Sequence, residues 1–222
     1  MKKKLILLLA AVMFAVPVCG QWHVGLSAGA SYNWYSIDRQ YQADFHYQGL
    51  WAPSAALSVQ YDFNGWLGAK AEVEYLRKDH RFYRTGLFAD TNYKVLNTYL
   101  QVPVMAVFRF GGQRLKGFAE LGGFAGYWAL GRLDGTLYNF GATKTPVPVG
   151  EDYSFLTDKD NRFDAGLLAG TGMEFVFSPH WAALLEARLN YSLVSTTKQY
   201  MTIRDYRYNT TASIRLGVQY LF

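Results

Sequence analysis

The last residues of the sequence alternate strictly between two kinds of side chain, and this alternation is the strongest restriction on what the chain can fold into. One parity is apolar or aromatic: Ala212, Ile214, Leu216, Val218, Tyr220 and Phe222. The other parity is mostly polar or small: Ser213, Arg215, Gly217, Gln219 and Leu221. A period of two is typical of a β-strand with unlike faces. Because chain ends fray unless a sheet holds them, we expect this strand to be paired along both edges.

The same alternation recurs along the chain and predicts eight strands in total. The other seven cover residues 22–34, 51–63, 67–75 and 100–110, and the segments centred on Leu121, Leu167 and Leu185. Short connections alternate with long ones, the short near 64–65, 111–116 and 178–180, the long near 36–50, 77–94, 131–161 and 194–209. Outer-membrane barrels have short periplasmic turns and long extracellular loops. We therefore predict an all-β fold, an eight-stranded antiparallel up-and-down transmembrane β-barrel whose last strand pairs with the first.

A soluble lipocalin-like barrel would show the same alternation, with its apolar face turned inward around a ligand. Two features favour a membrane barrel. The charged parity is also the glycine-rich parity, which suits the crowded interior of an eight-stranded barrel. The apolar parity carries aromatic residues at both ends, like the girdles at the two membrane interfaces. Near the long loops these are Trp34, Trp51, Tyr75, Phe163 and Tyr191, and near the short turns Trp22, Phe63, Phe110, Phe177, Trp181 and Phe222.

The first 20 residues have the pattern of a cleaved secretory signal peptide. Three lysines precede an apolar run from Leu5 to Val18 that is too short to span a bilayer, and Gly20 is a small residue before the cut. A lipoprotein signal acylated on Cys19 is the alternative, but Val18 stands where such signals carry Gly or Ala. We expect residues 1–20 to be removed and residues 21–222 to form the outer-membrane barrel domain.

Cleavage would also change the chain's charge and thiol content. It removes the single cysteine and three of the 22 Lys and Arg residues, which leaves 19 bases against 17 acids, a net charge of +2. The mature chain then has no thiol for disulfide or redox chemistry. Because the sequence pI of 9.2 includes the lost lysines, it overstates the basic character, and nucleic-acid binding is not indicated.

Several stretches resemble the PorT-like outer-membrane β-barrel proteins of Bacteroidota. They are TYLQVPVMAVFRF (98–110), ELGGFAGYW (120–128), RFDAGLLAGTGMEF (162–175) and LLEARLNYSL (184–193). The family's Tyr-Leu-x-x-Pro strand is matched by Tyr99, Leu100 and Pro103, and its aromatic-Asp-x-Gly strand start by Phe163, Asp164 and Gly166. The stretch YSLVSTTK departs from the family pattern after Tyr191. The resemblance implies the fold and the outer-membrane location, and it ties the namesake to secretion, but it implies no activity.

The ending resembles the recognition signal of the barrel-assembly machinery. That signal combines a polar residue, a glycine and two aromatics, matched here by Arg215, Gly217, Tyr220 and Phe222. The resemblance implies the barrel-assembly machinery as a partner during insertion.

Charged residues of the inward parity form the first candidate site. Ten are expected to form a hydrogen-bonded network in the lumen: Lys70, Glu72, Glu74, Arg109, Glu120, Asp164, Glu174, Glu186, Arg188 and Arg215. Unpaired charge in so narrow a space would be costly, so we expect these groups to pair and plug the barrel. Proton or ion conduction through a narrow pore is the alternative.

The histidines bear on an enzymatic role, because lipid A-modifying enzymes of the outer membrane are barrels of similar size that use a His with a Ser and an acid. His23 and His180 fall near the short turns, away from the outer leaflet, whereas His46 and His80 fall in long loops. Neither loop histidine has a serine at the expected spacing, and no His/Cys/Asp/Glu cluster with metal-ligand spacing is visible. We predict no catalytic, cofactor or metal site.

The long loops carry the remaining candidates. Their aromatic residues form either a binding surface or a packed cap: Tyr41, Phe45, Tyr47, Phe82, Tyr83, Phe88, Tyr93, Tyr138, Phe140, Tyr153, Phe155, Tyr200, Tyr206 and Tyr208. The second loop is basic and predicts contacts with lipopolysaccharide phosphates through Arg77, Lys78, Arg81, Arg84 and Lys94. The most economical interpretation is a non-enzymatic interaction or accessory protein of an outer-membrane complex, with an unknown protein partner at the extracellular loops.

Overall fold

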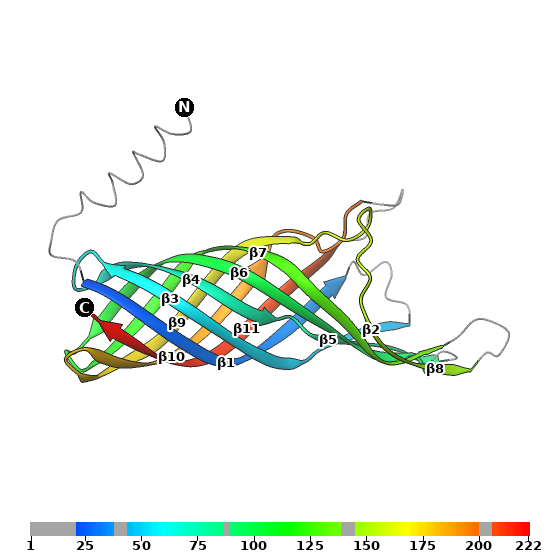
Figure 1. Cartoon of the computed structure of the whole chain (residues 1–222), viewed down its shortest axis with the longest axis horizontal. Helices are drawn as coiled ribbons and strands as arrows, with labels where there is room; N and C mark the ends of the chain where they lie inside the picture. Colours follow the sequence, from blue (N-terminus) through cyan, green and yellow to red (C-terminus); the bar gives the residue numbers. More distant parts are fainter. Residues whose placement is uncertain (1–20, 38–43, 87–88, 139–144, 200–205) are drawn as a thin grey trace, which may run out of the picture.

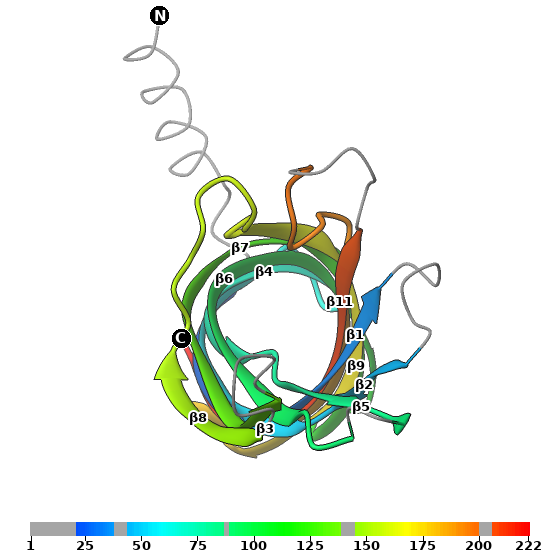
Figure 2. The same ribbon diagram turned by 90° about the vertical axis from the view of Figure 1, so that its right-hand side faces the viewer.

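Eight antiparallel strands close into a barrel, as the alternation predicts, and the fold class is confirmed (Figures 1 and 2). The computed structural model describes residues 21–37, 44–86, 89–138, 145–199 and 206–222, so the predicted signal peptide lies outside the described residues. In ring order the strands are β1 (Gln21–Ile37), β3 (Trp51–Asp62), β4 (Leu67–Arg77), β6 (Asn92–Gly111), β7 (Leu115–Tyr138), β9 (Phe163–Ser178), β10 (Trp181–Ser192) and β11 (Arg207–Leu221).

The last strand is paired along both edges, and this pairing closes the ring. Tyr220 of β11 lies opposite Val24 of β1 on one side and opposite Trp181 of β10 on the other. The connections at one end of the ring are short. In the turn between β3 and β4, the side-chain oxygen of Asn64 accepts hydrogen bonds from the backbone N–H groups of Trp66 (3.1 Å) and Leu67 (2.8 Å). Such side-chain bonding is the reason Asn is favoured in tight turns.

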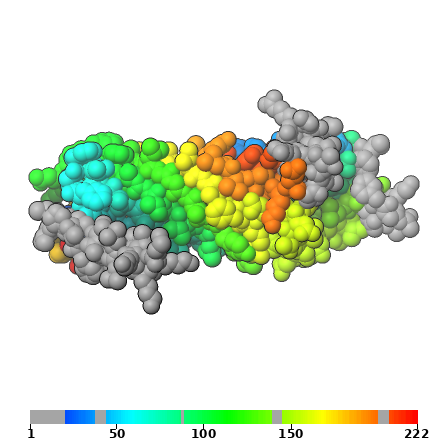
Figure 3. All heavy atoms as spheres, turned by 90° about the horizontal axis from the view of Figure 1, so that it is seen from above, coloured from blue at the N-terminus to red at the C-terminus, as the bar shows by residue number. Residues whose placement is uncertain are grey.

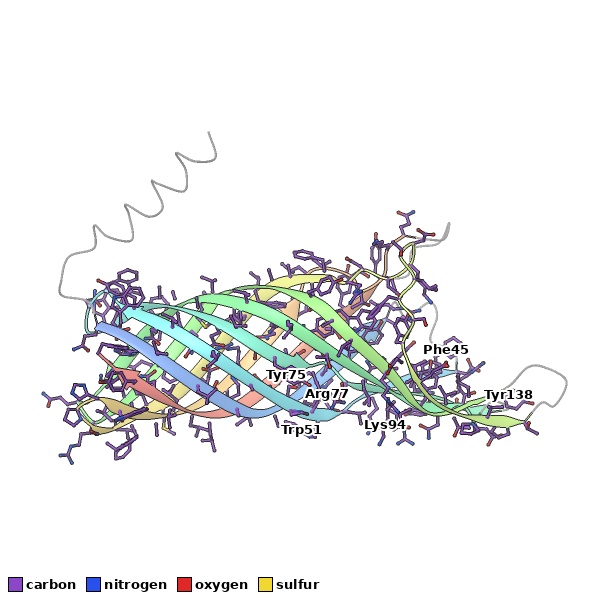
Figure 4. The ribbon with its side chains drawn as sticks, viewed as in Figure 1. Phe45, Trp51, Tyr75, Arg77, Lys94 and Tyr138 are labelled. Atoms are coloured by element: carbon purple, nitrogen blue, oxygen red, sulfur yellow. The ribbon has the colours of Figure 1, made fainter. Side chains whose placement is uncertain are left out.

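The outer wall of the barrel is apolar, with aromatic residues at both ends. All eleven predicted girdle residues are exposed on it, from Trp51 and Tyr75 at one end to Phe222 at the other. Aliphatic side chains such as Leu121 and Leu216, each more than 60% exposed, lie between the two girdles. Figure 4 labels Trp51 and Tyr75 on the strands near the long-loop end. Within the described ranges no helix is long and apolar enough to cross a membrane.

Bulky residues on β7 face glycines on β9 inside the barrel. Phe118 packs beside Gly172 and Phe124 beside Gly166, so that each ring occupies the space that a neighbouring side chain would need. The two rings belong to a small buried cluster with Met105, Val107 and Leu168. The glycine-rich parity in the sequence thus reflects close packing within the lumen.

Replacing Gly172 by Ala should lower the free energy of unfolding by about 1–3 kcal/mol, the usual cost of overpacking. A Cβ atom at this position would overlap both the Leu185 carbonyl oxygen and the Phe118 ring. Gly170→Ala is the matched control on the same face, because its nearest neighbour would be 3.2 Å away. Urea unfolding in lipid vesicles measures both variants, and equal losses of stability would contradict the packing argument.

The barrel continues beyond its long-loop rim as a five-stranded sheet, which we call the blade (Figures 1 and 2). It consists of β2 (Phe45–Gly49), β5 (His80–Arg84), the outer end of β6, the outer end of β7 and β8 (Pro146–Asp152), paired in that order. The prediction of simple loops at 36–50, 77–94 and 131–161 is therefore wrong in part. Figure 3 shows the resulting molecule as an elongated body.

The parity of the barrel continues into the blade along one strand and changes along another. β4 and β5 pair with β6 in one continuous register, with Arg77 opposite Thr98 and His80 opposite Val95, and between them the Lys78 backbone N–H donates to the Asn97 carbonyl (2.9 Å). The pairing of β6 with β7 shifts by one residue: Tyr99 lies opposite Trp128 and Thr98 opposite Leu130, so Ala129 of β7 has no opposite residue on β6. A β-bulge of this kind reverses which parity points inward.

Candidate functional site

A dense cluster of charges fills the middle of the lumen. Arg188 makes a two-pronged contact with Glu72 (2.8 and 2.9 Å) and also reaches Glu120 (3.1 Å) and Glu186 (2.8 Å). All four side chains are buried. Bidentate Arg–carboxylate pairs are the strongest and most directional ion pairs in proteins.

Two further bases complete this cluster. Arg215 bonds Glu74 (2.8 Å), Glu72 (3.1 Å) and Glu186 (2.5 Å). Lys70 contacts Glu120 and also Glu186 (2.9 Å). Each acid of the cluster therefore touches at least one base, which is what burial of so many charges requires.

A second group lies nearer the short-turn end. Arg109 pairs with Asp62 and lies 3.3 Å from Glu174, whose other oxygen is 3.6 Å from Lys116. His23 lies 3.1 Å from the Arg109 guanidinium. All ten residues that the sequence assigned to the lumen are thus buried in it, but Asp62, Lys116 and His23 were missed.

A third pair lies near the long-loop rim and corrects one prediction. Lys78 donates a hydrogen bond to Asp164 (2.6 Å), its side chain is fully buried, and its ammonium lies 4.8 Å from the Tyr99 ring. The Asp164 carboxylate also accepts from Ser192 (3.1 Å). Lys78 therefore does not reach lipopolysaccharide, because it continues the inward parity of β4.

A small cavity lies beside the central cluster. A cavity of about 10 Å³ lies between Lys70, Arg109, Phe118 and Glu120. A cavity needs about 10–15 Å³ to hold one water molecule. The gap beside these charges is therefore no larger than one water site.

A larger cavity, which we call the mouth pocket, lies where the lumen opens under the blade. Its volume is about 170 Å³, and its lining combines aromatic rings with polar groups: Tyr35, Tyr47, His80, Phe82, Tyr93, Val95, Asn97, Tyr99, Trp128, Leu133, Tyr153, Lys159, Thr196 and Arg207. The His80 ring stacks on Tyr35 with 4.2 Å between centroids, and Trp128 stacks between Tyr99 (6.0 Å) and Tyr153 (5.5 Å). These stacked rings give the pocket stiff walls.

Burial lowers the pKa of His80 to about 3, and the nearby positive charge of Arg207 adds to the shift, while a hydrogen bond with the Lys78 backbone opposes it. The ordinary histidine pKa is about 6.5, so the unfolded chain binds the proton more tightly than the folded one. The stability that neutral His80 contributes is then present above about pH 6.5 and is lost as the pH falls toward the folded value. His80→Phe, which keeps a ring against Tyr35, should reduce this loss, measured as urea unfolding at about pH 7 and about pH 4.5. An unchanged pH dependence would contradict the assignment.

The remaining basic residues of the predicted lipopolysaccharide set divide between the two faces of the blade. Arg81 and Lys94 lie opposite each other on neighbouring strands of its outer face, and Arg77 lies at the rim, where it binds Asp79 (2.6 Å). Arg84 shares the inward parity of Lys78 and His80, binds Asp44 and lies 4.7 Å from the Phe45 ring. Figure 4 labels Arg77 near the rim and Lys94 farther along the blade.

The outer face also carries Arg132, which the sequence analysis missed. It is exposed, and it lines a groove of about 340 Å³ with Arg77, Leu96, Leu130 and Phe155. Because the bulge in β7 changes the parity just before this residue, periodicity gave no signal for it. Its partner Asp152 is 3.9 Å away and exposed, so this ion pair is weak.

Most described loop aromatics pack against one another. On the inner face of the blade, Phe82 contacts the rings of Phe45, Tyr47 and Tyr93, with centroids 5.0–5.6 Å apart. Around the rim, Phe155 packs on Trp128 and Tyr153, Tyr206 stacks on Tyr208, and Tyr83 stacks on His46. Tyr138 lies on β7 near the end of the blade (Figure 4). Tyr41, Phe88, Phe140 and Tyr200 lie outside the described residues.

The four histidines lie in four different surroundings. His23 is in the lumen, His80 is in the mouth pocket, His46 is near Thr85 (3.5 Å) on the blade, and His180 is beside the Leu221 carbonyl in a short turn. In the described part of the chain no three His, Cys, Asp or Glu side chains are grouped as metal ligands would be.

The residues that resemble an assembly signal divide between the two faces of β11. Arg215 belongs to the central cluster, and Gly217 lies against Ser27 of β1. Tyr220 and Phe222 pack together on the outer wall, 4.9 Å between centroids.

Known outer-membrane proteins are similar to this chain in sequence or in fold. The sequence model of the family described as outer membrane protein beta-barrel domain matches residues 14–198. The chain belongs to this family. It is therefore an integral protein of the outer membrane, with short periplasmic turns and its blade outside the cell. No curated protein shows a significant sequence match to it.

Solved outer-membrane barrels share the fold. A major outer membrane protein from Thermus thermophilus is similar over 92% of this chain and all of its own, with a TM-score of 0.55 and 12% identity. OprG from Pseudomonas aeruginosa is similar over 91% of this chain and 96% of its own, with a TM-score of 0.54 and 13% identity. Identities this low establish the architecture and leave function to be argued from the chain itself.

Proposed function

We propose that this protein is a non-enzymatic interaction protein, in which a plugged barrel anchors an extracellular blade that binds a protein partner. The observation that carries the proposal is the blade itself. The ring closes through pairs below the rim, such as Phe108 with Ala119 and Ala71 with Val104, so closure does not require the outer ends of β6 and β7. Ordering extra backbone costs about 1–2 kcal/mol per residue, and a binding surface would account for it.

The interior supports the same proposal. The central cluster fills the lumen with paired charges, and the space beside it is about 10 Å³. This favours an anchor over a pore. The loop histidines His46 and His80 contact aromatic rings, which favours a binding role over lipid A chemistry.

The resemblance to PorT-like barrels of Bacteroidota suggests which partner to look for. On that basis we propose that the partner is a subunit of an outer-membrane complex, and a secretion apparatus is the first candidate for that complex. The blade would bind this subunit, and the barrel would hold the subunit at the membrane.

A pull-down from native outer membrane tests the proposal. In the variant, residues 136–148 are replaced by Asn-Gly, which trims the hairpin of β7 and β8 while keeping the pair Gly135–Val149. We expect wild type to recover a stoichiometric protein partner in mild detergent and the trimmed variant to lose it. Gln113→Ala, in a short turn at the opposite end, is the control and should retain the partner. Equal recovery by the trimmed variant, with heat-modifiable migration showing a folded barrel, would refute a role for this part of the blade.

Lipopolysaccharide is the proposed lipid partner, on a different surface. The groove at the rim combines the basic Arg77 and Arg132 with the apolar Leu96 and Leu130, and Leu130 is 66% exposed. Lys94 extends the basic surface away from the membrane. An apolar patch next to cations suits a lipid with a phosphorylated headgroup, and lipopolysaccharide has that chemistry in the outer leaflet.

A further inference from the structure

The floor of the mouth pocket contains two buried polar atoms that lack hydrogen-bond partners. They are the side-chain oxygen of Asn97 and the Nδ1 atom of His80, on side chains that are 3% and 5% exposed; the hydrogen bond of the His80 ring with the Lys78 backbone does not occupy Nδ1. Both residues line the same cavity. Leaving a buried polar atom unpaired costs about 1–3 kcal/mol, so each such atom in a native protein calls for a missing partner.

Three hydroxyl groups of the pocket wall already have partners. The Tyr35 hydroxyl lies 3.1 Å from the Thr196 hydroxyl, and the Tyr153 hydroxyl donates to Asp160 (3.0 Å). The backbone around Asn97 is also fixed, since its N–H bonds Asp79 and its carbonyl accepts from the Lys78 N–H (2.9 Å). The backbone of Asn97 is thus held in place while its side-chain oxygen remains unpaired.

The pocket is open at its rim. Its floor residues His80, Asn97, Tyr99 and Trp128 are buried, whereas Phe82 and other rim residues are half-buried. At about 170 Å³ it is smaller than the roughly 300 Å³ at which pockets for drug-sized ligands begin. It is also far larger than the 10–15 Å³ needed for a single water. The size suits one ring-sized group that enters from outside the cell.

We propose that the mouth pocket binds a single pyranose ring, as a free sugar or as the end of a glycan. A sugar hydroxyl would donate to the Asn97 oxygen, and a second hydroxyl would pair with His80, which is neutral in this site. The C–H face of the ring would pack on the aromatic wall that includes Phe82 and Tyr93. This inference goes beyond the proposed protein-binding role, because it rests on the cavity and requires no surface of the blade tip.

Trp128 reports on the pocket, because its indole N–H donates to the Leu130 carbonyl (3.0 Å) directly beside the site. The mature protein in nanodiscs, labelled with ¹⁵N at tryptophan, would be titrated with galactose, glucose, N-acetylglucosamine and glucuronic acid. We expect at least one sugar to shift the Trp128 indole signal saturably while the signal of the lipid-facing Trp51 stays unchanged. A response to glucuronic acid alone would assign an acidic sugar, with Lys159 and Arg207 at the rim as its contacts.

Two variants connect binding to the unpaired atoms. Asn97→Leu and His80→Phe keep the approximate shapes, and each should weaken binding about fivefold to tenfold, the effect of losing one hydrogen bond. Asn190→Leu is the matched control, because Asn190 also has an unpaired buried oxygen but does not line the pocket. If none of the four sugars shifts the Trp128 signal, or if Asn97→Leu and His80→Phe bind like wild type, the proposal is wrong. Neither result would affect the pull-down test of the blade.

Discussion

Replacing Arg188 by Met should lower the free energy of unfolding by about 3–5 kcal/mol, one of the two largest effects expected for a single substitution in this chain. Arg188 contacts Glu72, Glu120 and Glu186 in a space that excludes water. Methionine would fill the volume but leave carboxylates with too few cations, and uncompensated buried charge is strongly destabilising. Urea unfolding in lipid vesicles, followed by tryptophan fluorescence, measures the change.

Two further variants serve as controls for this prediction. Arg114→Met makes the same chemical change at an exposed position in a short turn and should alter stability by no more than about 0.5 kcal/mol. Adding Glu72→Gln to Arg188→Met removes one stranded charge, so the double variant should be more stable than Arg188→Met alone. A loss below about 1 kcal/mol for Arg188→Met would contradict the view that these charges hold the barrel together.

Replacing Lys78 by Met should also cost about 3–5 kcal/mol, because it removes the cation that pairs with buried Asp164. After the substitution Asp164 keeps only the Ser192 hydroxyl among its described side-chain partners. The amount of lipopolysaccharide that co-purifies per barrel should not change. This combination of outcomes separates a lumen residue from the surface lysine that sequence reasoning expected.

The double variant Lys94→Ala, Arg132→Ala should show the reverse behaviour. Both side chains are exposed, so stability should change by no more than about 0.5 kcal/mol per site. Each cation near a charged membrane surface contributes about 1 kcal/mol, so affinity for lipopolysaccharide should fall roughly tenfold or more. Phosphate assays on the purified protein measure bound lipopolysaccharide. If Lys78→Met lost it and the double variant kept it, the proposed lipid surface would be wrong.

The period-two pattern was sufficient to predict the eight-stranded ring and to predict which side chains face the lipid and which face the lumen. A strand that separates lipid from a packed lumen must keep one parity apolar, so the girdles and the ten inward charges followed from counting alone. The same argument explains why glycines such as Gly166 and Gly172 share the charged parity, since they lie beside the rings of Phe124 and Phe118.

The alternating pattern failed to predict the strands that continue beyond the membrane, because the apolar residues that mark one face stop there. Lys70, Glu72 and Glu74 define an inward parity that runs on through Lys78 and His80, but the pair Lys78–Asp79 looks like the start of a loop. The blade lies outside the membrane, so its strands do not need an apolar face toward lipid and give only a weak pattern. Arg132 faces outward because of the β-bulge in β7, and the alternating pattern of the sequence does not reveal that bulge. The mouth pocket brings together residues from distant segments, including Tyr35, Asn97 and Arg207.

Planar-bilayer conductance tests most directly the central claim that this barrel is a plugged anchor rather than a channel. The wild-type protein, inserted at single-molecule density and held at varied voltage, should show no discrete openings, because the ion-paired cluster around Arg188 and Arg215 fills the lumen. A steady conductance that scales with the number of inserted barrels would contradict the claim. The lumen charges would then line an ion path, and the function would have to be argued from conduction.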